Sequence, residues 1–245
     1  AKKLNGEIIN ADSMQVYKEF SILSSRPERK ELKKIKHHLY GIISVKKHFS
    51  AGDWLKLTKD KIDYCHKYKK IPIIVGGTGL YFNTITKGIS KIPHIDSHTR
   101  NKVRNLFKKL GYELFYKKLL DLDSKVKNKI LPSDSQRLQR AYEVVLKTKK
   151  SLFDWIADTK SDFINFEVSK IYLDIPRDEL LKKIYLRTEL MFENKCIREV
   201  KKFNSLKLKN SLSANKLIGI QEINAYLKGS STLDQCKELI NIKTR

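Results

Sequence analysis

Cysteine is scarce in this sequence, and its placement argues against two kinds of cross-linked fold. The 245 residues include three cysteines, Cys65, Cys196 and Cys236, which are far apart and form no CxxC pair. This odd number and wide spacing suggest neither a disulfide framework nor a structural zinc site. The adjacent His37 and His38 lack a third ligand at a metal-binding spacing, so no protein-held metal centre is predicted. A reducing cytoplasm is the expected location.

Long apolar runs and a targeting segment are also missing. The longest apolar runs, 39–45 and 71–75, are far shorter than the roughly 20 residues that span a bilayer. The N-terminal residues do not show the charged and then apolar pattern of a secretory signal. Hydrophobic residues make up 40% of the chain and charged residues 32%, which is enough apolar material for a packed core. We therefore expect a folded protein that does not associate with membranes.

Negative charge is in short supply. The chain has 27 Asp and Glu residues against 51 Lys and Arg residues, a formal net charge of +24. Such an excess favours a polyanionic partner such as nucleic acid, although a lysine-rich composition is also typical of AT-rich genomes. Only ten of the cations are arginine, so each arginine is expected where a planar, bidentate fork is useful. The arginines that deserve inspection are Arg26, Arg100, Arg104, Arg137, Arg140 and Arg187.

The hydrophobic pattern predicts an α/β fold with a parallel sheet. Strands are expected at 6–11, 39–44, 71–75 and 169–175. Helices are expected at 51–68, 177–203, 214–227 and 232–243. The run at 71–75 is entirely apolar, which is typical of a strand buried on both faces. Strands that alternate with helices indicate a parallel sheet.

Between these elements lies a stretch that is helical throughout. From Ser97 to about Thr148, apolar residues recur every three or four positions, and Asp134 is a good N-cap for a helix over 136–146. We therefore predict a core of residues 1–95 and 149–245, with an all-helical insertion at 96–148.

Three groups of polar residues are candidates for chemistry. Gly76 and Gly77 follow a strand, where free backbone N–H groups can face an anion, although a tight turn is the commoner reason for such a pair. Thr78 can face a ligand or cap the next helix. Asp12 ends the first strand, at the edge where parallel sheets bind ligands, and would serve as a general base, a magnesium ligand or a turn cap.

The third group lies on the helix that Asp134 caps. Gln136, Arg137 and Arg140 are three or four residues apart, so amide and guanidinium groups share one side of the helix. This combination suits base edges or phosphates, and a solvated charged face explains it equally well.

Seven segments occur in an order that resembles the tRNA dimethylallyltransferase family along nearly the whole chain. They are INADSMQVYKEF (9–20), RP (26–27), HHL (37–39), FSAGDW (49–54), IPIIVGGTGLYF (71–82), SDSQRLQRAYEV (133–144) and LIGIQEI (217–223). The resemblance implies a P-loop NTPase-like core whose helical insertion binds the tRNA anticodon stem-loop. It also implies transfer of a dimethylallyl group from dimethylallyl diphosphate, with Mg2+, to N6 of the adenosine 3′-adjacent to the anticodon. The target base would be flipped out of its stack.

The resemblance also assigns roles to individual residues. It makes Asp12 the general base and places Arg187 against the diphosphate, together with the backbone of Gly76 and Gly77. The residues implied to bind tRNA are Ser13, Met14, Gln15, Thr78, Arg100, Gln136, Arg137, Leu138, Gln139, Arg140 and Lys216. A monomer is expected.

The chain departs from the family pattern in several places. No GxTxxGK[ST] phosphate loop occurs in residues 1–245, Ile220 stands where the family has a tyrosine, and Lys195–Cys196 replace a glycine-bearing turn. Because of the missing loop, we expect the chain to be a truncated, inactive fragment of the enzyme. The alternatives are a tRNA-binding remnant without catalysis, an enzyme that prenylates free adenine nucleotides, and a nucleotide kinase. The Gln and Arg face of the insertion argues against a free-nucleotide substrate, and the 12–17 and 76–81 motifs argue against a kinase.

Overall fold

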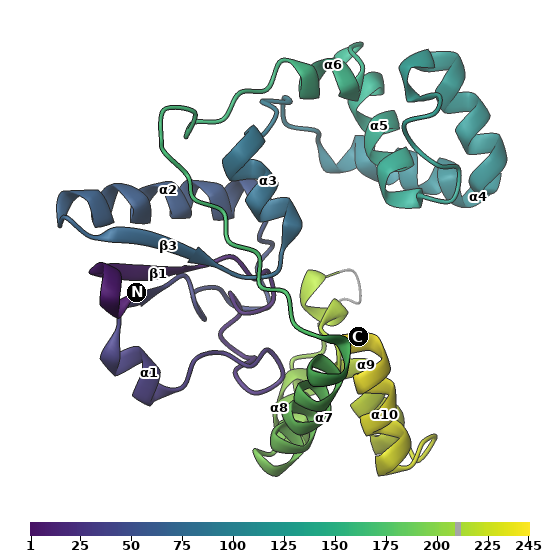
Figure 1. Ribbon diagram of the computed structural model, residues 1–245. Coiled ribbons are helices and arrows are strands. Elements are labelled where there is room, and N and C mark those ends of the chain that lie inside the picture. Colours follow the sequence, from purple (N-terminus) through teal and green to yellow (C-terminus); the bar gives the residue numbers. More distant parts are fainter. Residues whose placement is uncertain (209–211) are drawn as a thin grey trace. The chain divides into compact units, whose positions relative to one another are not determined.

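The computed structural model describes residues 1–208 and 212–245, which form two compact units (Figure 1). One unit comprises Ala1–Phe82 and Glu167–Arg245, and the other comprises Asn83–Phe166. The strands are β1 (Gly6–Asn10), β2 (His37–His38) and β3 (Ile71–Val75). The helices are α1 (Arg29–Lys34), α2 (Ala51–Lys67), α3 (Gly79–Lys87), α4 (Ser97–Leu122), α5 (Ser135–Thr148), α6 (Leu152–Ala157), α7 (Arg177–Glu193), α8 (Cys196–Ser205), α9 (Ile220–Leu227) and α10 (Leu233–Thr244), with short 3-10 turns η1 (Lys2–Leu4), η2 (Ser124–Val126) and η3 (Ser213–Lys216).

The first unit contains a parallel sheet in the order β2-β1-β3. Helix α2 begins at Ser50, whose hydroxyl accepts a hydrogen bond from the backbone N–H of Asp53, as expected of an N-cap. Trp54 of this helix is fully buried, and its ring N–H donates to the Asn10 carbonyl oxygen over 2.7 Å. The predicted α/β class, the strands at 6–11 and 71–75 and the helix at 51–68 are therefore confirmed.

The strand predicted at 39–44 was wrong. The pairing strand is the two residues before it, His37 and His38, and Ile43 makes only an isolated bridge with Tyr17. Leu39 has φ +64° and Gly41 has φ +58°, so the backbone turns where an extended strand would continue.

Two further expectations were wrong, namely the burial of the strand 71–75 on both faces and the strand at 169–175. Within the described sheet β3 lies at one edge, where Ile71 and Val75 are nearly half exposed, so this strand is not buried on both faces. Residues 169–175 form no strand, and Ile171, Tyr172 and Leu173 are each more than four-fifths exposed. An apolar, β-branched sequence indicates that a segment can be buried. A strand also requires backbone hydrogen bonds to a neighbouring strand, which composition does not reveal.

The C-terminal helices pack against the segment that follows β1. Phe20 and Leu23 share one buried cluster with Val200 of α8, Ile223 of α9 and Ile240 of α10, and the four helices α7 to α10 group together in Figure 1. The helix predicted at 177–203 is divided into α7 and α8. Its break follows from Lys195, whose φ of +69° is incompatible with a continuous helix.

The second unit is helical, and its bounds are wider than the 96–148 expected for the insertion. Helix α4 bends at Gly111 (φ +70°), and its residues Phe115 and Leu119 bury themselves against Leu138 of α5. Asp134 caps α5 by accepting a hydrogen bond from the Arg137 N–H at 3.0 Å. The unit extends to Asn83–Phe166 because contacts of the flanking segments, such as the 2.7 Å hydrogen bond between the Ser90 and Thr159 hydroxyls, join both ends to it. None of the helices described is both long and apolar enough to span a membrane.

Candidate functional site

The carboxyl ends of β1 and β3 converge, and Gly76 makes that approach possible. The Ala11 N–H donates to the Val75 carbonyl at 2.7 Å, and the Thr78 N–H donates to the Ala11 carbonyl at 3.1 Å. A Cβ atom on Gly76 would lie 2.2 Å from the Ala11 carbonyl carbon and 2.7 Å from the Asp12 nitrogen. The glycine is therefore required by close backbone contact, which sets the Gly76–Gly77 turn beside Asp12.

Asp12 forms a tight turn that leaves one carboxylate oxygen available. Its Oδ1 accepts hydrogen bonds from the Met14 N–H at 2.7 Å and the Gln15 N–H at 3.3 Å, and within the described residues Oδ2 has no partner. The Thr78 hydroxyl accepts from the Ser13 N–H at 2.9 Å and lies 3.3 Å from the Ser13 hydroxyl. Thr78 thus connects the turn after β3 to the turn after β1. The Asp12 carboxylate is oriented by the backbone N–H groups of the two residues that follow Ser13.

A cavity of about 250 Å3 in the first unit brings together four of the residues predicted from sequence. Asp12, Met14, Arg187 and Lys216 all line it, although they come from separate parts of the chain. Its apolar wall includes Leu23, Met191, Leu217 and Ile240. A single acidic group therefore faces two cations across a partly apolar space.

Among the residues that the structure describes, Arg187 is held by hydrogen bonds to a loop and not by an ion pair. Its Nε donates to the Ser25 hydroxyl at 2.7 Å, and its Nη2 donates to the Leu23 carbonyl at 3.3 Å. Burial lowers the pKa of the Arg187 guanidinium, and the charge of Asp12 opposes that shift. The group remains a cation, and its unused N–H donors are available to an anion in the cavity.

The Gln15 side chain has a structural task. Its amide nitrogen donates to the carbonyl oxygens of Ser24 and Ser25, at 2.8 and 3.1 Å. Both hydrogens of the amide are therefore used by the same loop that holds Arg187. The tRNA contact predicted for Gln15 would have to use its carbonyl oxygen or its backbone.

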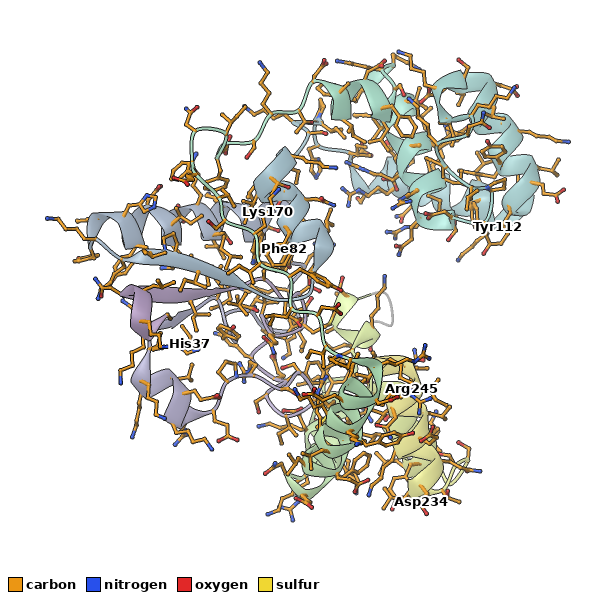
Figure 2. All side chains as sticks on the ribbon, in the orientation of Figure 1. His37, Phe82, Tyr112, Lys170, Asp234 and Arg245 are labelled. Atoms are coloured by element: carbon orange, nitrogen blue, oxygen red, sulfur yellow. The ribbon has the colours of Figure 1, made fainter. Side chains whose placement is uncertain are left out.

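The structure also gathers three possible metal ligands that sequence spacing did not reveal. Donor atoms of Glu7 on β1, His38 on β2 and Cys65 on α2 lie within 4.8 Å of one another, and all three residues are buried. Burial raises the pKa of the Cys65 thiol, which disfavours the thiolate that binds metals. The His38 Nε2 and the Glu7 carboxylate already satisfy each other at 2.6 Å, so we assign this group to the core. The neighbouring His37, labelled in Figure 2, is engaged with the Ile35 carbonyl at 2.7 Å.

The second unit has a groove of about 470 Å3 lined by polar side chains only. They are Arg100 and Arg104 of α4 and Gln136, Gln139, Arg140 and Glu143 of α5. The Nε of Arg100 is buried and, within the described residues, has no hydrogen-bond partner. A buried donor without a partner is costly, so an acceptor from water or from a bound molecule would satisfy it.

Two residues of the predicted tRNA-binding run do not face this groove. Leu138 is fully buried in the core of the unit, so its side chain supports α5 and the prediction of an RNA contact was wrong for that side chain. Arg137 is exposed, and its Nε lies 3.5 Å from the Asp134 carboxylate at the start of the helix. Conversely, Glu143 was missed, although 136, 139, 140 and 143 have the i, i+3, i+4, i+7 spacing of one helix face.

Comparison with known proteins identifies the family to which this geometry corresponds. The sequence model of a family described as IPP transferase matches residues 15–245. The tRNA dimethylallyltransferase of Pelagibacter ubique (strain HTCC1062) is 54% identical over 245 residues, which cover 100% of this chain and 78% of that protein. The tRNA dimethylallyltransferase of Wolbachia pipientis wMel is 41% identical over 242 residues, covering 98% of this chain and 80% of that protein.

Two solved structures are similar along the whole chain. The full-length tRNA isopentenylpyrophosphate transferase of Bacillus halodurans is 29% identical with a TM-score of 0.66, over 99% of this chain and 76% of that one. A eukaryotic dimethylallyltransferase described as acting on tRNA is 25% identical with a TM-score of 0.83, over 100% of this chain and 62% of that one.

Proposed function

Because the chain belongs to the IPP transferase family, we propose that it transfers a dimethylallyl group from dimethylallyl diphosphate to tRNA. The acceptor is N6 of the adenosine 3′-adjacent to the anticodon. The observation that carries this proposal is the cavity in which Asp12 faces Arg187 and Lys216. It offers one proton acceptor, two cations and an apolar wall, which are the groups that this transfer requires.

Asp12 acts as the general base in this scheme. An exocyclic amine is a poor nucleophile because its lone pair is delocalised into the ring, so removal of its proton assists attack. The N6–carbon bond forms, the carbon–oxygen bond to diphosphate breaks, and the N6 proton passes to Asp12. The available Oδ2 suits this task, since Oδ1 is occupied by the turn.

The cations stabilise the leaving group. Charge grows on the diphosphate as the carbon–oxygen bond breaks, and fixed donors in a partly buried site stabilise that charge effectively. Arg187 and Lys216 would supply the positive charge, and the backbone of Gly76 and Gly77 would supply N–H donors. The apolar wall formed by Met191 and Leu217 would contact the five-carbon chain.

Magnesium fits this arrangement through the substrate. Mg2+ in proteins keeps several waters and commonly binds the phosphate oxygens of a substrate. The diphosphate oxygens would hold the ion, so that Oδ2 of Asp12 stays available for the N6 proton, and the ion when bound would neutralise negative charge on the leaving group.

The groove of the second unit is assigned to the anticodon stem-loop. Three arginines can meet phosphates or guanine edges, and two glutamines can read adenine edges. The net charge of +24 supports both binding of RNA and a monomeric state, since like-charged copies repel one another. We extend the proposal to a P-loop NTPase-like core, in line with the parallel sheet, and to action in the cytoplasm, where tRNA is found.

The test uses the product of the complete gene, with Mg2+, labelled dimethylallyl diphosphate and either unmodified tRNA or AMP. Label on tRNA alone is the expected result. Label on AMP would instead identify an enzyme that prenylates free nucleotides. Bound tRNA without label on either acceptor would overturn the transfer reaction and every catalytic role given above.

A further inference from the structure

A carboxylate outside the cavity holds the tip of the loop that forms one of its walls. Glu199 lies on α8, and its Oε1 accepts hydrogen bonds from the Ser21 N–H at 2.7 Å and the Ile22 N–H at 3.0 Å. Its Oε2 accepts from the Leu23 N–H at 2.9 Å. The Ser21 hydroxyl adds a fourth contact at 3.2 Å. Three consecutive backbone N–H groups thus converge on one side chain.

The same loop also holds the guanidinium of Arg187. The Leu23 carbonyl and the Ser25 hydroxyl accept the two hydrogen bonds that orient the guanidinium. Leu23 and Arg187 both line the cavity, whereas Glu199 does not. Glu199 therefore contacts loop 21–25, the loop contacts Arg187, and Arg187 lines the cavity.

We infer that Glu199 is a positioning residue for the transfer reaction, acting through loop 21–25 on the aim of the Arg187 guanidinium. This inference rests on the proposed function, since it requires that Arg187 meets the diphosphate. Bonds from N–H groups to a carboxylate are stronger than neutral ones, so they can hold a loop that lacks regular secondary structure. A guanidinium is a planar fork, so a small error in its orientation removes a bidentate contact.

The double-mutant cycle of Glu199 and Arg187 tests this route in the complete gene product. A misplaced group in an active site costs up to about a hundredfold, so Glu199→Ala should lower kcat/KM for dimethylallyl transfer by roughly tenfold to a hundredfold. In an Arg187→Ala background, the same Glu199 change should cost less than about twofold, because the group that it positions is gone. A purely structural role for Glu199 would instead lower activity by the same factor in both backgrounds.

Milder variants keep the test decisive if Glu199→Ala fails to fold. Glu199→Gln retains one acceptor oxygen but turns an NH2 group toward at least one loop N–H, so its activity should lie between wild type and alanine. Ser25→Gly removes only the hydroxyl that accepts from Arg187, and glycine tolerates the φ of +51° at that position. It should lower kcat/KM in the same direction, and again have little effect without Arg187.

The matched control is Glu189→Ala on α7, the helix that carries Arg187. Glu189 is an exposed partner of Lys237 and touches neither the loop nor the cavity, so its loss should change kcat/KM by less than about twofold. Circular dichroism and urea unfolding serve as the check that each variant is folded, because binding of an anticodon stem-loop would report on the second unit and these residues lie in the first.

The results for the Arg187 and Glu199 variants distinguish a failure of the positioning role from a failure of the proposed function. If Arg187→Ala leaves transfer unchanged, the role of Arg187 in the proposed function is wrong. If Arg187→Ala impairs transfer while the effect of Glu199→Ala is absent, or is equal in both backgrounds, the positioning role is overturned and the proposed function stands.

Discussion

Replacing Asp12 by asparagine should abolish most of the chemistry while leaving the turn intact. Asparagine keeps the oxygen that accepts from the Met14 and Gln15 N–H groups, so the local fold is retained. The amide cannot take a proton from N6. Loss of a general base costs about 10²- to 10⁴-fold in rate, which corresponds to about 3 to 5 kcal/mol of transition-state stabilisation.

The companion variant Asp12→Ala separates folding from chemistry. It removes the acceptor of two backbone N–H groups and should therefore also lower the free energy of unfolding by about 1 to 3 kcal/mol. Single-turnover transfer to tRNA gives the rate, binding of the same tRNA gives the affinity, and urea unfolding gives the stability. A rate for Asp12→Asn within threefold of wild type would refute the general-base role. An equal loss of rate and affinity would show that Asp12 binds the ground state.

Three further predictions concern other parts of the molecule. Replacing Arg100 and Arg140 together by alanine should lower the slope of log affinity against log salt for tRNA by about 1.5, because two phosphate contacts are lost. Gly76→Ala should destabilise the protein by about 2 kcal/mol or more in urea unfolding, since its Cβ would overlap the backbone after β1. Asp96 caps α4, and hydrogen bonds from the backbone and from a lysine lower its pKa, so its contribution to stability is fully present above its ordinary pKa of 3.8 and is lost as the pH falls from there through the lowered pKa of the folded state. The thermal midpoint of Asp96→Asn should therefore lie below wild type near pH 6, and the gap should narrow progressively as the pH is lowered below 3.8.

Each of these has a control in the same chain. Arg198→Ala lies in the other unit and should leave the salt slope unchanged; an unchanged slope for the groove variant would mean that these arginines do not meet phosphates. Gly77→Ala has nothing within 4 Å of its added Cβ and should be tolerated, so equal effects at both glycines would contradict the argument from close backbone contact. A gap between Asp96→Asn and wild type that is independent of pH would contradict the assignment to ionisation.

Local signals in the sequence were sufficient for local structure. Asp134 was recognised as an N-cap because its carboxylate and the N–H from which it accepts are only three residues apart. The turn after 71–75 was recognised because a pair of glycines directly after a strand most often forms a tight turn. The predictions failed where the structure of a segment depends on residues far away in the sequence. Residues 169–175 have the composition of a strand, but in the described structure they pair with no other strand. The exposed side chain of Tyr172 shows that an apolar composition is not sufficient for burial.

The meeting of Asp12 with Arg187 could be predicted only through the resemblance. Asp12 precedes Arg187 by most of the chain, and no periodicity links them. Their meeting depends on the packing of α7 and α10 against the segment after β1, which is a tertiary fact. The groove could be predicted in part from the sequence, because the residues of one helix face recur at a 3.6-residue period. The side chain of Leu138 is buried on the other face of α5, and the motif that contains it does not show which face is buried.

Glu199 marks the limit of sequence inference most clearly. In the sequence it is one glutamate among lysines on a charged helix, IREVKK, with no motif around it. Its partners are backbone N–H groups of residues 21–23, and backbone groups are the same for nearly every amino acid, so the loop carries no signature of being bound. What singles out Glu199 is the convergence of three donors on one carboxylate together with the contact of the same loop to Arg187. If that convergence controls the reaction, activity in this protein depends on a residue that can be found only after the loop and the cavity have been placed side by side.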